Sequence, residues 1–225
     1  DTTIEYKPKY LDPSLISQSP SIAIGQAKQE IIRMGQYSVQ GLQEVIQHIN
    51  TYDKKHVNTV AQIEEAINNL DQKTTEYLVS ISKQSLSAQD SKVHNILLEN
   101  IRDIERIGDH MENLIEFTEF IENNGAQLSE EAMQELNDML ELVVETVSLA
   151  IQSLDKLDVE AANQALANED QIDDMERKLR KHHIKRLNEG TCTGSAGVIF
   201  VDIISNLERV GDHAANIAES VINLK

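Results

Sequence analysis

Proline is confined to the first twenty residues of the chain. The three prolines are Pro8, Pro13 and Pro20, and none occurs in residues 21–225. Because proline interrupts the backbone hydrogen bonding of a helix, its absence permits long unbroken helices. Only nine glycines occur in 225 residues, while apolar residues make up 40% of the chain. This composition favours a packed helical protein over a sheet protein that is rich in turns.

Apolar residues after Pro20 recur at intervals of three and four, which is the spacing of one face of a helix. One such stripe begins at Ile24 and continues through Leu42 to Ile49. Breaks in this pattern divide the chain into six expected helices, at about 20–50, 55–84, 89–122, 129–154, 158–188 and 196–224.

Local signals indicate where two of these helices begin. Ser19 followed by Pro20 resembles a helix start, with proline in the first turn. Ser129 precedes Glu130 and Glu131, and it is expected to cap the fourth helix while the two acids lie in the positive first turn. The segment before Pro20 is expected to be an extended arm.

Two segments, IERIGDHMEN at 104–113 and LERVGDHAAN at 207–216, are nearly the same. Alignment of 101–116 with 204–219 gives eight identities in sixteen positions, and the earlier helices match more loosely at an offset of 105 residues. Such self-similarity indicates an internal duplication. The expected fold is all-α, with two tandem antiparallel three-helix bundles related by that duplication. The expected domains are an arm at 1–20, a first bundle at 21–124 and a second bundle at 129–225.

Acidic or amide side chains recur four residues apart at equivalent places in the two repeats. They are Glu64 with Asn68, Glu105 with Asp109, Glu169 with Asp173, and Glu208 with Asp212. Residues four apart share a helix face, where two carboxylates repel each other unless a cation lies between them. We expect the second and third helices of each repeat to bring their pairs together at one cation site, with Glu112 as an additional ligand in the first. The alternative is a solvated acidic face, since the chain has 38 acidic residues.

Oxygen ligands of this kind suit iron, manganese, magnesium or calcium, and zinc is also compatible. The sequence leaves the choice among these metals open. Gly108 and Gly211 lie inside expected helices, where each glycine costs about 1 kcal/mol relative to alanine. Their repetition indicates that a neighbouring helix, or a cation with its waters, comes close to the backbone there.

Two further residue types are duplicated beside the acidic pairs. His110 and His213 follow the aspartates by one residue, about 100° round the helix, so they are expected to contact a partner helix rather than ligate a cation. Arg106 and Arg209 follow the glutamates, and they are expected to form surface ion pairs.

Several classes of function are disfavoured by composition. The net charge of −18 opposes binding to nucleic acid, and the single cysteine, Cys192, excludes an internal disulfide. No apolar run approaches the roughly 20 residues that span a membrane. No nucleophile with its base and no phosphate loop with its lysine is found, so an enzyme is not expected. A helical interaction scaffold without a functional metal, or a metal-dependent enzyme, are the alternatives to a metal-binding regulator.

The segments IERIGDHMENL and LERVGDHAANIAE resemble the signature of the PhoU family of phosphate-signalling proteins, and the resemblance extends over about residues 21–224. It implies two three-helix bundles whose Glu/Asp-x-x-x-Asp motifs bind multinuclear metal clusters. Those motifs fall on the four pairs named above, with Asn68 as the departure from the pattern. The implied function is a metal-binding regulatory domain in phosphate transport and homeostasis.

The segment YLDPSLISQSPSIAIGQAKQEIIRMG, at 10–35, resembles the junction that follows the membrane part of sodium/phosphate-cotransporter-like proteins. Such proteins carry a PhoU-like domain at the C-terminus. The resemblance implies a cytoplasmic tail held at the inner face of the cell membrane by a membrane domain absent from these residues, which begin with Asp1 rather than methionine. The implied partners are that transporter domain, in the same or another chain, a signalling protein, and a second copy of the chain as a homodimer.

Overall fold

The computed structural model describes residues 3–224, and within that range it consists of seven helices without a strand. Residues 1, 2 and 225, which belong to the expected arm and second bundle, lie outside the described range. The helices are α1 (Leu15–Gln18), α2 (Pro20–Thr51), α3 (Lys54–Ile81), α4 (Ala88–Asn123), α5 (Glu130–Lys156), α6 (Val159–Asn188) and α7 (Gly194–Ile222). The six long helices match the six that the apolar pattern predicts, whereas α1 was not expected.

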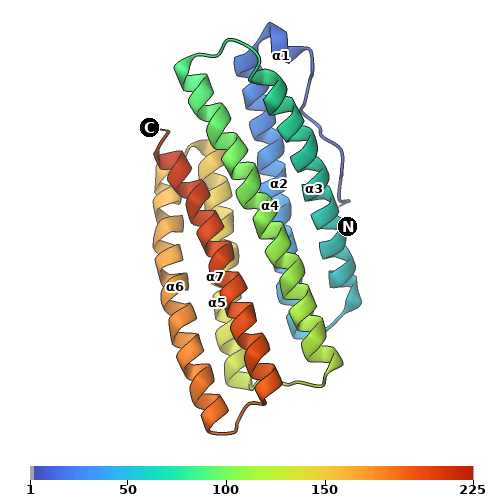
Figure 1. The fold of residues 1–225 in the computed structure, drawn as a ribbon, viewed down its shortest axis with the longest axis vertical. Coiled ribbons are helices and arrows are strands. Elements are labelled where there is room, and N and C mark those ends of the chain that lie inside the picture. The colour runs from blue at the N-terminus through green and yellow to red at the C-terminus, as the bar shows by residue number, and fades with distance from the viewer. Residues whose placement is uncertain (1–2, 225) are drawn as a thin grey trace.

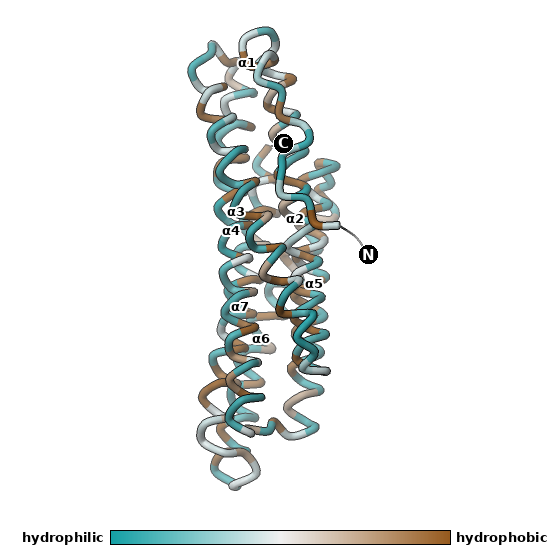
Figure 2. Tube along the Cα trace, turned by 90° about the vertical axis from the view of Figure 1, so that its right-hand side faces the viewer, coloured by the Kyte–Doolittle hydropathy of each residue, from teal (hydrophilic) through white to brown (hydrophobic). Residues whose placement is uncertain are grey.

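The long helices form two elongated bundles that lie side by side (Figure 1). Helices α2, α3 and α4 pack on one another in the first bundle, and α5, α6 and α7 do so in the second. Helix α2 also packs on α5, and α4 packs on α7. Hydrophilic and apolar residues alternate along each long helix (Figure 2), and the buried apolar side chains of both bundles form a hydrophobic core. The expected fold class, an all-α tandem of antiparallel three-helix bundles, is confirmed.

The same connection joins the first and second helices of both bundles. In each case the first helix ends at a left-handed residue, Tyr52 with φ 54° and Leu157 with φ 51°. An aspartate then caps the next helix: Asp53 accepts from the Lys55 N–H at 3.0 Å, and Asp158 accepts from Ala161 at 3.1 Å. The short left-handed turn and the cap reverse the chain sharply, so the helices of each hairpin lie antiparallel.

The expected helix starts are present with one difference. The hydroxyl of Ser129 accepts from the Ala132 N–H at 3.1 Å and caps α5, as predicted. Helix α2 begins at Pro20 as expected, but the hydroxyl of Ser19 makes no capping hydrogen bond. Helix α3 ends at Ile81, three residues before the expected end, because the chain turns there and its backbone N–H groups bond three residues back.

The arm is folded onto the first bundle and is not extended throughout. The backbone N–H groups of Lys9 and Tyr10 donate to the carboxylate of Glu30, which is fully buried on α2. Arg33, one turn further on, forms an ion pair with the same carboxylate at 2.6 Å. Figure 1 shows the arm running beside α3 before it turns through α1 into α2. A buried carboxylate thus holds the backbone of the arm in one path.

The contact between the bundles is reciprocal. On α4, His110 shares a hydrogen bond of 2.8 Å with Asn206 of α7; on α7, His213 shares one of 3.0 Å with Asp103 of α4. The sequence repeat makes Asp103 equivalent to Asn206 and His110 equivalent to His213. An exchange of equivalent contacts across an interface is the mark of a twofold relation. The expectation that both histidines contact a partner helix is confirmed, and the two rings lie 5.7 Å apart.

No helix within residues 3–224 carries an apolar stretch long enough to cross a bilayer.

Candidate metal centre

Carboxylates of α6 and α7 converge in the second bundle. Asp173 on α6 and Glu208 and Asp212 on α7 each offer a ligand oxygen, and these atoms lie within 4.8 Å of one another. A second group on α6 joins Glu169 and Asp173 to Asp170 by the same criterion. The predicted pairs therefore meet across two helices, and Asp170, which lies off the four-residue stripe, is an oxygen donor that the pattern did not predict.

Close packing of α7 on α6 brings these side chains together. A Cβ atom on Gly211 would lie 3.1 Å from Cδ1 of Ile172, which is buried on α6 next to Asp173. This contact is tighter than ordinary van der Waals packing, so the missing side chain of Gly211 permits the approach. On Gly108 a Cβ would lie 3.9 Å from Ile67, an ordinary distance. The expectation that a neighbouring helix comes unusually close therefore holds at Gly211 but is wrong at Gly108.

Two glutamates of the second bundle hold protons unusually tightly. Burial, followed by hydrogen bonds with Asp173 and Asp212, raises the pKa of Glu169 to about 8. Burial, followed by a hydrogen bond with Asp212, raises the pKa of Glu208 to about 7. A proton shared between carboxyl groups relieves the repulsion that two adjacent negative charges would produce. A cation at the same place would relieve it in the same way.

One oxygen in this cluster has no donor. Oδ1 of Asp173 is buried without a hydrogen-bond partner in the part of the chain that is described. A buried acceptor left unpaired costs free energy, and such atoms are uncommon in folded proteins. Carboxylate oxygens alone form a donor set that suits hard cations. The residues present therefore fit a metal ion.

The first bundle contains a related but looser cluster. Burial, followed by a hydrogen bond with Glu112, raises the pKa of Glu64 to about 8, and the charges of Asp109 and Glu105 contribute. Burial also raises the pKa of Glu105, with the charge of its neighbour Asp109 as the next cause. Four of the predicted residues thus meet between α3 and α4, including Glu112, the additional acid of this repeat.

The first cluster differs from the second at two residues, Asn68 and Asp71. Asn68 is solvent-exposed, and no described contact joins it to the four acids. Asp71 on α3, which the repeated pattern did not predict, contributes a negative charge that raises the pKa of Glu105. Within residues 3–224, both groups of three acids whose oxygens lie within 4.8 Å belong to the second bundle.

The two arginines beside the motifs behave differently from the prediction. Arg106 and Arg209 are exposed, and neither has a carboxylate oxygen within 4.0 Å over the described range. The expectation of surface ion pairs is wrong for both. Each arginine follows its glutamate by one residue, so its guanidinium lies on the solvent side of the helix while the glutamate turns towards the cluster.

The family model "PhoU domain" matches the chain twice, at residues 31–118 and 136–221. The chain belongs to the PhoU domain family. Each match covers one bundle, so the internal duplication repeats the PhoU unit.

Curated relatives extend over most of the chain. "Phosphate-specific transport system accessory protein PhoU homolog 1" of Thermotoga maritima is 27% identical over 199 residues, which is 88% of this chain and 85% of that protein. A PhoU homolog of Xylella fastidiosa is 28% identical and covers 87% of this chain and 81% of its own length. "Putative inorganic phosphate export protein YjbB" of Salmonella typhimurium is 20% identical over 96% of this chain, but the match spans 40% of that longer protein.

Solved PhoU structures share the fold. PhoU from Pseudomonas aeruginosa gives a TM-score of 0.83 at 21% identity and covers 89% of this chain and 95% of its own. The phosphate transport system regulatory protein PhoU from Streptococcus pneumoniae gives 0.81, also at 21% identity, and covers 92% and 96%.

Proposed function

We propose that this chain is a metal-binding regulatory domain in phosphate transport. The observation that carries the proposal is the convergence of Asp173, Glu208 and Asp212, whose oxygens lie within 4.8 Å of one another beside a buried oxygen of Asp173 without a donor. These three acids, with Glu169 beside them, are costly at one surface unless they share protons or a cation. Of the two sites, the one in the second bundle binds metal more tightly.

The ligands of the second site are Glu169, Asp173, Glu208 and Asp212. Those of the first are Glu64, Glu105, Asp109 and Glu112, while the exposed Asn68 would join them only if its side chain turns inward. The candidate metals are iron, zinc, manganese, magnesium and calcium. A bound cation supplies positive charge between two helices that otherwise repel. Because the ligands come from both helices, they stiffen the pair, and a stiffened pair can present a different surface to a partner.

The role in phosphate transport is supported by the names of the relatives, which describe accessory and regulatory proteins of phosphate transport rather than enzymes. The proposed partner is a membrane transporter domain, in the same or another chain, with a signalling protein or a second copy of this chain as further partners. The Salmonella relative supports the first arrangement, since the matching part is 40% of a longer phosphate export protein. The domain then lies at the cytoplasmic face of the membrane.

The test is the metal content and metal affinity of matched variants. Protein purified without chelator is analysed for its metals, and chelator-treated protein is titrated by calorimetry. Asp212→Asn should remove most high-affinity binding, because charge count is one of the terms that set cation affinity. Asp109→Asn, at the equivalent place in the first bundle, should mainly affect a weaker class of sites. Glu219→Gln on the exposed side of α7 is the control, and it should bind as the unmodified protein does.

Two results would contradict the proposed metal sites or their ranking. If the unmodified protein retains no metal and gives no heat with any of the five cations, the acidic clusters are solvated surfaces and the chain is an interaction scaffold. If Asp109→Asn abolishes the tight class and Asp212→Asn spares it, the ranking of the two bundles is reversed. Whether a membrane domain belongs to the same chain is decided by expressing the full-length gene product and asking whether it enters membranes.

A further inference from the structure

A pocket opens directly beside the second cluster. Its volume is about 440 Å³, and its walls come from α6 and α7. Two of its lining residues, Asp173 and Glu208, belong to the candidate metal centre. Three others are arginines, Arg177, Arg180 and Arg209. In a chain of net charge −18, three arginines lining one pocket are a local exception.

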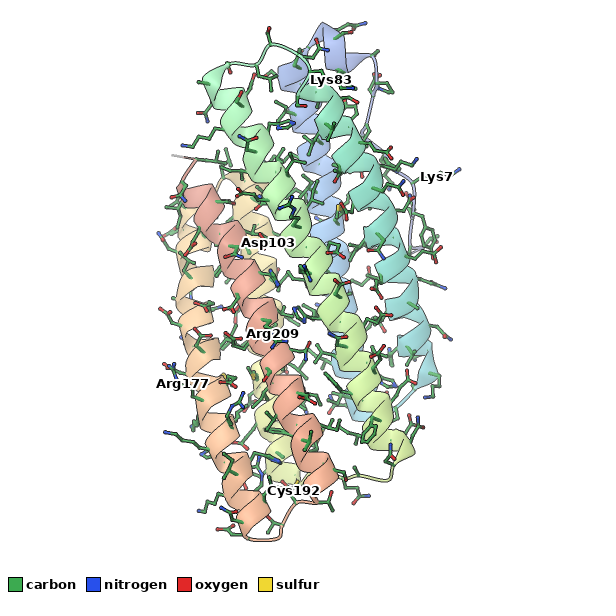
Figure 3. The ribbon with its side chains drawn as sticks, viewed as in Figure 1. Lys7, Lys83, Asp103, Arg177, Cys192 and Arg209 are labelled. Carbon is green, nitrogen blue, oxygen red and sulfur yellow. The ribbon has the colours of Figure 1, made fainter. Side chains whose placement is uncertain are left out.

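The arginines are available to a ligand. Arg209 has no ion pair within residues 3–224. Arg177 pairs with Asp174 three residues before it, and Arg180 pairs with Glu176 four residues before it. The pair of Arg177 with Asp174 is exposed on both sides and contributes little to stability, so an incoming anion competes with it at small cost. Glu176 is largely buried and holds Arg180 in place, which leaves the remaining N–H groups of that guanidinium for a ligand. Figure 3 labels Arg177 on α6 and Arg209 on α7, the two neighbouring helices that form the walls.

A hydroxyl group completes the polar lining. Arg180 donates to Oγ of Ser205 on α7 at 3.2 Å, and Nε of the same guanidinium donates to Glu176 at 2.9 Å. Arg180 therefore bridges the two helices at the mouth of the pocket. A planar guanidinium held this way offers a fork of donors that matches the oxygens of a phosphate group.

The charges of the pocket make any anion site dependent on a cation. The lining includes three arginines and three acids, Asp173, Glu176 and Glu208, which balance one another. Glu169 and Asp212 of the same cluster add further negative charge, and a divalent cation held among these carboxylates would bring the combined charge of pocket and cluster close to neutral. A multiply charged oxyanion then meets metal on one side and guanidinium groups on the other, whereas without metal it meets carboxylates.

The first bundle lacks this arrangement. The positions equivalent to Arg177 and Arg180 are Gln72 and Thr75, so α3 offers no guanidinium there. Ser205 corresponds to Arg102, but Arg102 lines a different groove, against the C-terminal part of α7. Arg106 is the one arginine retained from the set, as the counterpart of Arg209.

We infer that the pocket of the second bundle is a binding site for inorganic phosphate, which bridges the metal and the side chains of Arg180 and Arg209. The inference rests on the proposed metal site and goes beyond it, because it assigns the anion to one of two otherwise similar sites. The two bundles then differ in what they bind: both bind cations, and the second bundle also binds phosphate.

The experiment titrates inorganic phosphate into chelator-treated protein and into protein reloaded with manganese, with the metal content measured in every sample. Reloaded protein should bind phosphate, and chelator-treated protein should bind it at least about tenfold more weakly. Arg180→Gln combined with Arg209→Gln should lower phosphate affinity about tenfold or more while leaving the manganese content unchanged. Arg106→Gln is the control from the first bundle, and its phosphate affinity should stay within about twofold of the unmodified protein.

The outcomes separate the two proposals. If manganese is retained but phosphate does not bind, or binds the double variant equally well, the phosphate site is refuted and the metal site stands. If neither manganese nor any of the other four candidate cations is retained, both are refuted together. Parallel titrations with sulfate and with glycerol phosphate identify the anion: the inference requires inorganic phosphate to bind more tightly than either, and preference for the ester would overturn it.

Discussion

Individual glutamates of the candidate centre differ between the folded and unfolded chain in how they bind protons. In the folded protein the pKa is about 8 for Glu64 and Glu169 and about 7 for Glu208, against an ordinary value of 4.5. Below pH 4.5 both states carry these protons, and the pH has no effect through them. As the pH rises towards 8, the unfolded chain gives up the protons first. The free energy of unfolding therefore falls as the pH rises.

This difference predicts the pH dependence of the metal-free protein. The urea midpoint, measured in chelator, should fall between pH 5 and pH 8.5. Glu208→Gln should flatten that decline, because a neutral amide cannot lose a proton. Glu219→Gln on the same helix should keep the full slope, since that side chain is exposed. An unchanged slope in Glu208→Gln would contradict the assignment of the raised pKa.

The acidic pairs could be predicted from the sequence because helical periodicity determines which residues share a face of the helix. Asp71 could not, since it acts on Glu105 through the packing of α3 on α4. Asp170 could not either, because it lies beside Glu169 on α6 and off the four-residue spacing on which the prediction rested. Arg106 and Arg209 were wrongly predicted to form surface ion pairs, because the sequence does not indicate the direction in which a flexible, exposed side chain turns. Whether each arginine finds an ion-pair partner depends on the neighbouring surface residues, which spacing along the helix does not predict.

At the scale of helices, the duplicated glycines have different surroundings. Gly108→Ala should stabilise the metal-free protein by up to about 1 kcal/mol, because alanine favours helix and the new methyl group meets Ile67 at an ordinary 3.9 Å. Gly211→Ala gains the same propensity but presses on Ile172 at 3.1 Å. It should be less stable than Gly108→Ala by about 1 kcal/mol or more.

Urea unfolding of the two variants in chelator measures this difference directly. Equal stability would show that α7 can move away from α6 without loss, and that the close contact at Gly211 does not hold the acidic side chains together. Circular dichroism without urea serves as the check that both variants retain the helical fold.

The long helices could be predicted from apolar spacing and from caps such as Ser129, whereas the path of the arm could not. Glu30 occupies a position on α2 that periodicity alone describes only as part of a helix. Its partners are the backbone groups of Lys9 and Tyr10, some twenty residues earlier. Backbone contacts of this kind leave no trace in residue types, so the docked arm appears only in the structure.

At the scale of the whole molecule, the sequence repeat predicts two similar bundles but not how they meet. The exchange of His110 and His213 contacts across α4 and α7 gives the twofold arrangement, and α2 meets α5 through a close contact. A Cβ on Gly35 would lie 2.3 Å from Cδ1 of Ile151 on α5. Glycine at this position lets the first helices of the two bundles approach.

The contact between bundles can be tested with two glycines of the same helix. Gly35→Ala forces Ile151 to move and should destabilise the protein by about 1–3 kcal/mol. Gly25→Ala, also on α2, meets no atom within 4 Å and should stabilise by up to about 1 kcal/mol. Urea unfolding of both proteins checks the order. A Gly35→Ala protein as stable as Gly25→Ala would mean that the bundles adjust freely at this contact.

The central claim is that the carboxylate clusters hold cations in the folded protein. The most direct measurement is the melting temperature of chelator-treated protein before and after addition of iron, manganese, magnesium, zinc and calcium in turn. A cation that binds only the folded state stabilises it by mass action, by about 2.7 kcal/mol at one hundred times the dissociation constant. The account predicts a concentration-dependent rise in melting temperature with at least one of these cations, which Asp212→Asn reduces. An unchanged melting temperature with all five would contradict it.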